Sequence, residues 1–185
     1  MIGYLPESLE VCGRDIPINA DFRNILTIFE ALADETLTKE EKAYICIKRL
    51  YREPIGTDII EEAIKKAFWF VDGGDMPKSK PEEVRTIDWK HDEQMLLPAI
   101  SKAMGIVDVR SLPYVHWWTF LGAFGEIGEG LFSQVVHIRH KLNHSKKLDK
   151  SEKEFLKKNK ELIILRTAEE QAEIAETEEF LKKFI

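Results

Sequence analysis

Apolar side chains recur along most of this chain at spacings of three and four residues, from Phe22 to Leu142. This spacing puts the apolar side chains on one face of a helix, where they can be buried together. Proline, glycine and capping residues divide the pattern into successive segments. We therefore predict six helices, at residues 19–32, 38–51, 57–71, 88–103, 111–124 and 131–142.

Side chains that can bond to free backbone groups mark the starts of several of these helices. Thr38 and Glu41 have the spacing of a capping box, in which each side chain accepts from the backbone N–H of the other residue. We expect Asn19, Asp88 and Ser111 to cap the first, fourth and fifth helices. The sequence thus predicts both the helices and the residues at which they begin.

The two ends of the chain depart from this pattern. Between residues 9 and 18, apolar side chains alternate on either side of a Gly-Arg-Asp turn at residues 13–15, which indicates a short β-hairpin that the first helix covers. Residues 149–185 carry a thin apolar stripe on an otherwise charged segment, which predicts a long helix. The predicted fold is mostly α, a multi-helix single domain with an N-terminal β-hairpin. Residues 1–147 form its helical core, and residues 148–185 form a charged C-terminal helical extension.

The stretch from Trp89 to Arg139 carries the most distinctive motifs. They are Trp89-Lys-His-Asp92-Glu, Met95-Leu-Leu-Pro-Ala99-Ile100, Met104-Gly105-Ile106-Val-Asp108-Val109, Leu112-Pro-Tyr-Val-His-Trp117-Trp118-Thr-Phe120 and Ile138-Arg139. In these motifs, and more weakly between Leu9 and Ile28, the chain resembles the bacteriophage gene-product-fifteen (Gp15) family. The resemblance implies a role in assembling phage tails, because many members are encoded between the major tail protein and the tape measure protein, and it brings no catalytic residues to carry over. The chain departs from the family at Met104, where members more often carry an aromatic residue, and in its acidic C-terminal segment.

Composition narrows the class of protein. The 185 residues are 44% hydrophobic and 32% charged, which is usual for a globular protein. No apolar run approaches the roughly 18 residues of a membrane helix, and the first residues do not resemble a secretory signal. We therefore expect a protein of the host bacterial cytoplasm that binds no membrane. Cys12 and Cys46 are expected to be buried free thiols.

The charge of the chain is unevenly distributed. A net charge of −6 argues against a general affinity for nucleic acid, because phosphate binding requires clustered Lys and Arg. Residues 137–160 nevertheless hold nine basic and three acidic side chains, a local charge of +6, so that the remainder carries −12. Residues 168–179 contain six glutamates and no basic residue. Blocks of opposite sign favour ordered self-association, and we expect a homo-oligomer.

Three histidines are the strongest candidates for a metal site. His137, His140 and His144 lie on one face of the sixth predicted helix. Three ligands from one helix rarely complete the tetrahedron that zinc prefers. We therefore interpret this face as solvated and basic, and we predict no metal site.

Catalytic and nucleotide-binding patterns are equally weak. His91, Asp92 and Glu93 are adjacent, so they point to different faces of a helix and are expected to stabilise its start rather than to act as acid and base. Residues 128–133 give only a partial glycine loop without a preceding strand. We predict neither a catalytic site nor a cofactor, and hence a protein that is not an enzyme.

Apolar side chains that could bind a partner come from two regions. Consecutive residues on a helix point about 100° apart, so one tryptophan of a Trp-Trp pair can fill the core while the other anchors an interface at its rim. The C-terminal segment could dock as a helix in a groove. The candidate interaction residues are Trp117, Trp118, Phe155, Leu162, Leu165, Phe180 and Phe184.

The resemblance implies a phage or prophage tail assembly chaperone that is not an enzyme. It would bind the tape measure protein and other tail proteins during tail morphogenesis, and it would be absent from the finished virion. One alternative is a structural tail component retained in the virion, such as a connector or tail-tip adaptor. Another is a small helical nucleic-acid-binding protein that uses the lysines of residues 146–160, whose DNA binding would be sensitive to salt.

Overall fold

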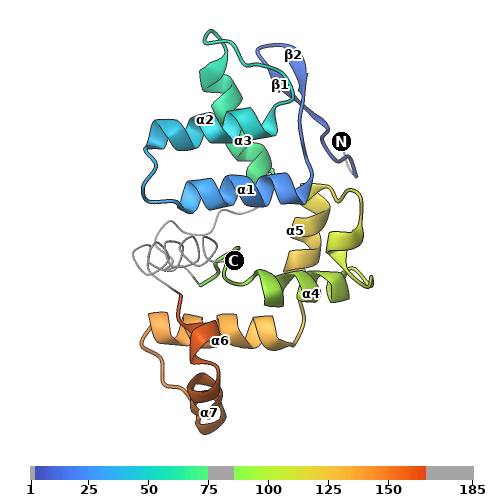
Figure 1. Cartoon of the computed structure of the whole chain (residues 1–185). Coiled ribbons are helices and arrows are strands. Elements are labelled where there is room, and N and C mark those ends of the chain that lie inside the picture. Colours follow the sequence, from blue (N-terminus) through green and yellow to red (C-terminus); the bar gives the residue numbers. More distant parts are fainter. Residues whose placement is uncertain (1–2, 75–85, 166–185) are drawn as a thin grey trace, which may run out of the picture.

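The computed structural model describes residues 3–74 and 86–165. Within these residues the fold is mostly helical with an N-terminal two-stranded hairpin, as predicted. The hairpin and the first three helices lie at one end of the molecule, α6 and α7 lie at the other, and α4 and α5 lie between them (Figure 1). The elements are β1 (Ser8–Val11), β2 (Arg14–Pro17), α1 (Phe22–Ala33), α2 (Lys39–Leu50), α3 (Ile60–Val71), α4 (Glu93–Ala103), the 3-10 helix η1 (Val109–Ser111), α5 (Trp117–Gly125), α6 (Leu131–Asn143), α7 (Lys150–Lys158) and α8 (Lys160–Ile163).

The hairpin turns earlier than the sequence pattern indicated. β1 and β2 are antiparallel, and the residues between them are Cys12 and Gly13. Their φ angles are 49° and 75°, and positive φ at both central residues is the geometry of a type I′ turn. The inner face of the hairpin packs against α3, where α1 had been expected. This packing buries Leu9, Val11 and Ile16.

The start of α2 is confirmed, whereas α1 begins with a different cap. Glu41 N–H donates to Thr38 Oγ1 at 3.2 Å, and Thr38 N–H donates to Glu41 Oε2 at 2.8 Å, which is a complete capping box. The cap of α1 is Asp21 rather than Asn19. The backbone N–H of Asn19 instead donates to the carbonyl of Leu50 at 2.7 Å, so this residue joins the chain to the end of α2.

The fifth predicted helix begins later than Ser111, which instead ends the short helix η1. The chain before Trp117 stays extended because it pairs with the segment that precedes α1; Trp117 N–H donates to the carbonyl of Ala20 at 2.7 Å. The cap of α5 is His116, whose Nδ1 accepts from Trp118 N–H at 3.0 Å. A contact between distant segments therefore sets this helix start.

The fourth helix also begins later than predicted. Asp88 caps the turn before α4 by accepting from two backbone N–H groups of that turn, at 3.0 and 2.9 Å. Asp92 occupies the N-cap position of α4 without making a side-chain capping bond. Its carboxylate pairs with Arg139 instead.

The described part of the C-terminal segment forms two short helices rather than the beginning of one long helix. α7 starts at a capping box of Asp149 and Glu152. Asn159, with φ −125° and ψ 35°, then separates α7 from α8. Its side-chain amide donates to the carbonyl of Phe155 at 3.0 Å, a local bond of the kind by which Asn competes with helical backbone. The rest of the predicted helix, residues 166–185, lies outside the described residues.

A buried ion pair joins α6 to α4 and α8. The side chains of Arg139 and Asp92 are 3% and 0% exposed, and they form two parallel bonds of 2.7 and 2.8 Å. Arg139 also donates to the carbonyls of Thr86, Leu162 and Ile163. All five N–H donors of the guanidinium group are thereby used, so a single side chain ties together three segments that are distant in sequence.

We expect Arg139→Met to destabilise the protein by about 3–5 kcal/mol, because it leaves the carboxylate of Asp92 buried without its partner. The measurement is the free energy of unfolding in urea. The double variant Arg139→Met/Asp92→Leu should recover part of the loss, since it removes both charges. Arg110→Met is the control, because the pair of Arg110 with Asp108 lies at the surface. An Arg139→Met protein as stable as the control would contradict this account.

The two cysteines should differ in reactivity. Only Cys46 is buried as predicted, and burial raises the pKa of its thiol to about 11. Cys12 is exposed, and its hydrogen bond to Glu62 raises the pKa of its thiol above the usual value. Thiol labelling of the native protein at pH 8 should therefore modify one cysteine, and labelling in denaturant two. Glu62→Gln should speed the labelling of Cys12, and rapid labelling of Cys46 in the native protein would contradict its burial.

Candidate partner-binding groove

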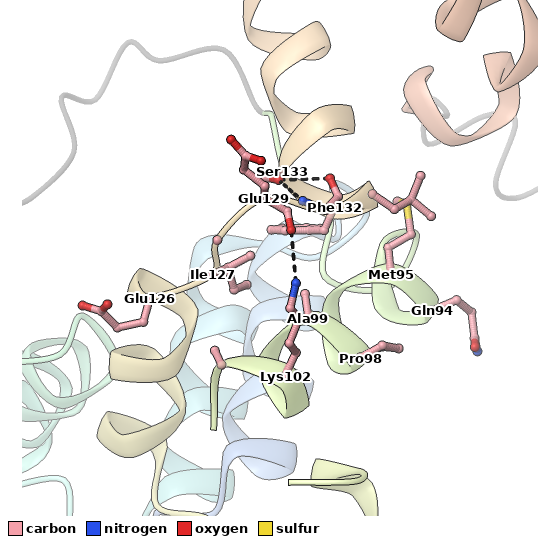
Figure 2. Close-up of a pocket in the computed structure, with 14 residues that line it drawn as sticks. Gln94, Met95, Pro98, Ala99, Lys102, Glu126, Ile127, Glu129, Phe132 and Ser133 are labelled. Atoms are coloured by element: carbon pink, nitrogen blue, oxygen red, sulfur yellow. Dashed lines mark hydrogen bonds between the residues drawn. The ribbon is translucent and has the colours of Figure 1, made fainter. Parts of the chain in front are cut away.

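An open groove lies between the outer face of α4 and the segment that connects α5 to α6 (Figure 2). Its volume is about 460 Å³. Met95 and Phe132 form buried parts of its wall, whereas Leu131 is 47% exposed. The other apolar side chains that line the groove are Pro98, Ala99, Ala103 and Ile127.

The local sequence explains why this part of the surface is open. Pro98 lies inside α4 and has no N–H to donate to the carbonyl of Gln94. For this reason proline is normally excluded from the interior of a helix. Across the groove, α6 begins at Gly130, whose N–H donates to Ser133 Oγ at 2.9 Å. Lys102 spans the gap by donating to the carbonyl of Glu129 at 3.4 Å (Figure 2). The groove thus lies between α4 and the start of α6, and Lys102 bridges its two sides.

The groove is lined mainly by apolar side chains and backbone, with a few charged side chains. Its wall contains neither His nor Cys, and the hydroxyl of Ser133 bonds to the backbone of Gly130. Charged side chains lie at its edge: Lys102 comes from α4, and Glu126 and Glu129 come from the connecting segment. An apolar wall with a few charges at the edge is typical of a surface that receives an amphipathic helix.

The predicted tryptophan pair belongs to the aromatic core. Trp117 is fully buried and its indole N–H donates to the carbonyl of Val71 at 2.8 Å. Trp118 is half-buried, and its indole N–H donates to the carbonyl of Phe70 at 2.9 Å. Both indoles therefore hold the end of α3. Gly74, with φ +79°, lies directly against Trp118, where an added Cβ would come within 3.1 Å of the ring.

The other predicted interaction residues lie apart from the groove. Phe155 and Leu162 are half-buried and pack against the core from α7 and α8. Leu165 is half-buried, and Phe180 and Phe184 lie outside the described residues. The structure brings none of the described candidates into the groove, and their role in binding stays a prediction.

The three histidines of α6 lie beside lysines. His137 and His144 are exposed and His140 is half-buried. The rings of His140 and His144 are 4.1 Å apart, and His137 Nε2 lies 3.2 Å from Glu152 Oε1. Lys141 also bonds to Glu152, and this bond lowers the pKa of the Glu152 carboxyl group. Among the described residues, no group of three or more His, Cys, Asp or Glu side chains is arranged to hold a metal ion.

Fold and groove together define a mostly helical protein with an N-terminal β-hairpin and an open apolar groove between α4 and α6. The chain belongs to the Bacteriophage Gp15 protein family, whose family model matches residues 1–165. The predicted resemblance is therefore confirmed, and this family is not known as one of enzymes. No curated protein and no solved structure matches the chain. In the described part of the chain, no helix has the length and apolar character needed to cross a membrane.

The two tryptophans should contribute unequally to stability. We expect Trp117→Ala to lower the free energy of unfolding by about 3–5 kcal/mol, because it leaves a cavity in the core and an unpaired carbonyl at Val71. Trp118→Ala should cost less, since that side chain is partly exposed. Urea denaturation followed by circular dichroism measures both values. A larger loss for Trp118 than for Trp117 would contradict the packing described above.

Proposed function

We propose that this protein is a tail assembly chaperone, which binds the tape measure protein of its phage or prophage in the host cytoplasm and is absent from the finished virion. Membership of the Bacteriophage Gp15 protein family over residues 1–165 is the observation that carries the proposal. The open apolar groove supports it, because a chaperone without catalytic activity needs a surface to which an unassembled partner can bind.

The physical need for such a protein follows from the partner. In the role that the family implies, a tape measure protein would expose long apolar helical segments until tail tube subunits polymerise around it. Exposed apolar surface of this kind drives aggregation. A protein that covers these segments reversibly would keep the tape measure available for assembly.

The groove is the docking site that we infer for such a segment. The side chains of Met95, Ala99 and Phe132 offer an apolar wall to anchors on one face of a helix. Lys102 and the two glutamates at the edge could pair with charges that flank those anchors. Leu131 is exposed at the mouth of the groove, where a bound helix would cover it.

The test is co-expression with the tape measure protein, followed by size-exclusion chromatography with light scattering. We expect a soluble complex, together with an insoluble tape measure when that protein is expressed alone. Ala99→Arg should abolish the complex, because a long charged side chain would fill the groove. Ala33→Arg is the matched control, since Ala33 is an exposed residue at the end of α1.

Three results would redirect this proposal. Equal binding by the Ala99→Arg and Ala33→Arg variants would remove the groove from the interface and leave the chaperone role intact. The absence of any complex would contradict the chaperone role itself. Detection of the protein in purified virions would favour a structural component of the tail, such as a connector or tail-tip adaptor.

A further inference from the structure

The surface along α6 changes from apolar to basic. Leu131, Phe132 and Ser133, at the N-terminal end of α6, line the groove, whose edge carries Glu126, Glu129 and Lys102. Lys141 and His144 lie near the other end of α6, and Lys146, Lys147 and Lys150 follow within a few residues. One helix therefore runs from an apolar groove with acidic residues at its edge to a basic surface.

The C-terminal sequence has the complementary order. Residues 169–179 contain six glutamates and no basic residue. Residues 180–185 follow with the sequence Phe-Leu-Lys-Lys-Phe-Ile, in which Phe180 and Phe184 have the i, i+4 spacing of two anchors on one helix face. The segment therefore changes from acidic to apolar and basic.

We propose that residues 169–185 bind along α6 of the same chain and that Phe180 and Phe184 occupy the groove. In this arrangement the glutamates of residues 169–179 lie over the basic end of α6. Lys182 and Lys183 then lie near Glu126 and Glu129 at the edge of the groove. The block of glutamates then meets a basic surface, the two lysines meet an edge that carries two glutamates and one lysine, and the two phenylalanines meet the apolar wall.

The dimensions allow this contact. α6 has 13 residues and is therefore about 20 Å long, while residues 169–184 would span about 23 Å as a helix. The described chain ends at Leu165, just after the carbonyls of Leu162 and Ile163 accept from Arg139 in the second half of α6. The segment thus starts beside the basic end and is long enough to reach the groove at the other end.

An intramolecular contact is favoured over exchange between two copies. A short tether gives the attached segment an effective concentration on the order of millimolar, provided that it can span the distance. A second copy of the chain reaches such a concentration only in a very concentrated solution. Self-association through the same blocks of charge stays a separate prediction.

The consequence for function rests on the proposed chaperone role. If the groove receives a helix of the tape measure protein, the C-terminal segment competes for the same site. It would shield the apolar wall in the free protein, and the partner would displace it on binding. Removal of the anchors should then raise the apparent affinity for the partner, because no competitor has to be displaced.

Disulfide trapping in the full-length protein tests the contact without the partner. The variant Cys12→Ser/Glu129→Cys/Lys183→Cys places one thiol at the edge of the groove and one between the two phenylalanines, while Cys46 stays buried. Dilute protein would be treated with a mild oxidant, and the products followed on non-reducing gels and by mass spectrometry. We expect an intramolecular disulfide that forms at least tenfold faster than in the control Cys12→Ser/Val107→Cys/Lys183→Cys. Val107 is a demanding control because it is 100% exposed and open to any random collision.

A second variant separates binding from mere proximity. Adding Phe180→Ser and Phe184→Ser to the trapping variant should lower the rate of disulfide formation to that of the control. An unchanged rate, equal rates at Glu129 and Val107, or covalent dimers in place of the intramolecular product would each overturn the proposal. If the disulfide forms while no tape measure complex is found, the intramolecular contact stands and the proposed function fails.

Discussion

The pairing of Arg139 with Asp92 is the interaction on which the second half of this fold depends. Arg139 places its five N–H donors on two carboxylate oxygens and on three backbone carbonyls from two other segments. A buried charge pair is stabilising only when such additional hydrogen bonds compensate for its loss of water. The pair fixes α6 against α4 and holds α8, a helix of four residues, beside them.

The elements that could be predicted from sequence are those governed by local interactions. The helical periodicity, the hairpin and the Thr38 capping box involve residues within a few positions of each other, and all three are found in the structure. Two of the predicted helix caps failed because of long-range contacts. Ser111 did not cap α5 because the following chain pairs with the residues before α1, and Asn19 did not cap α1 because its backbone N–H bonds to the carbonyl of Leu50 at the end of α2. At Asn159 the cause is local. The apolar stripe predicted a continuous helix, but the side chain of Asn159 bonds to the carbonyl of Phe155 and the helix breaks at this residue.

In the candidate site, too, local features could be predicted from the sequence and long-range contacts could not. The Trp-Trp motif indicated a buried aromatic centre, and Trp117 is indeed packed between Phe29, Trp89 and Phe120. The groove could not be anticipated, because its two walls come from α4 and from residues 126–133, which the sequence keeps apart and the fold brings together. A proline inside α4 was the one local sign that this helix keeps an open face. The family motifs from Trp89 to Arg139 contained both members of the ion pair, yet their spacing gave no indication that they meet.

The ion pair and the groove are linked through the two helices that they share. α4 carries Asp92 before its first residue and the groove residues Met95 and Ala99 within its next turns, while α6 carries Phe132 at its start and Arg139 two turns later. The bidentate bond therefore sets the separation of the two helices that wall the groove. A groove whose width is fixed in the free protein binds without the cost of ordering its own walls. In this fold a buried ion pair thus supports an open apolar groove, because both use the same pair of helices.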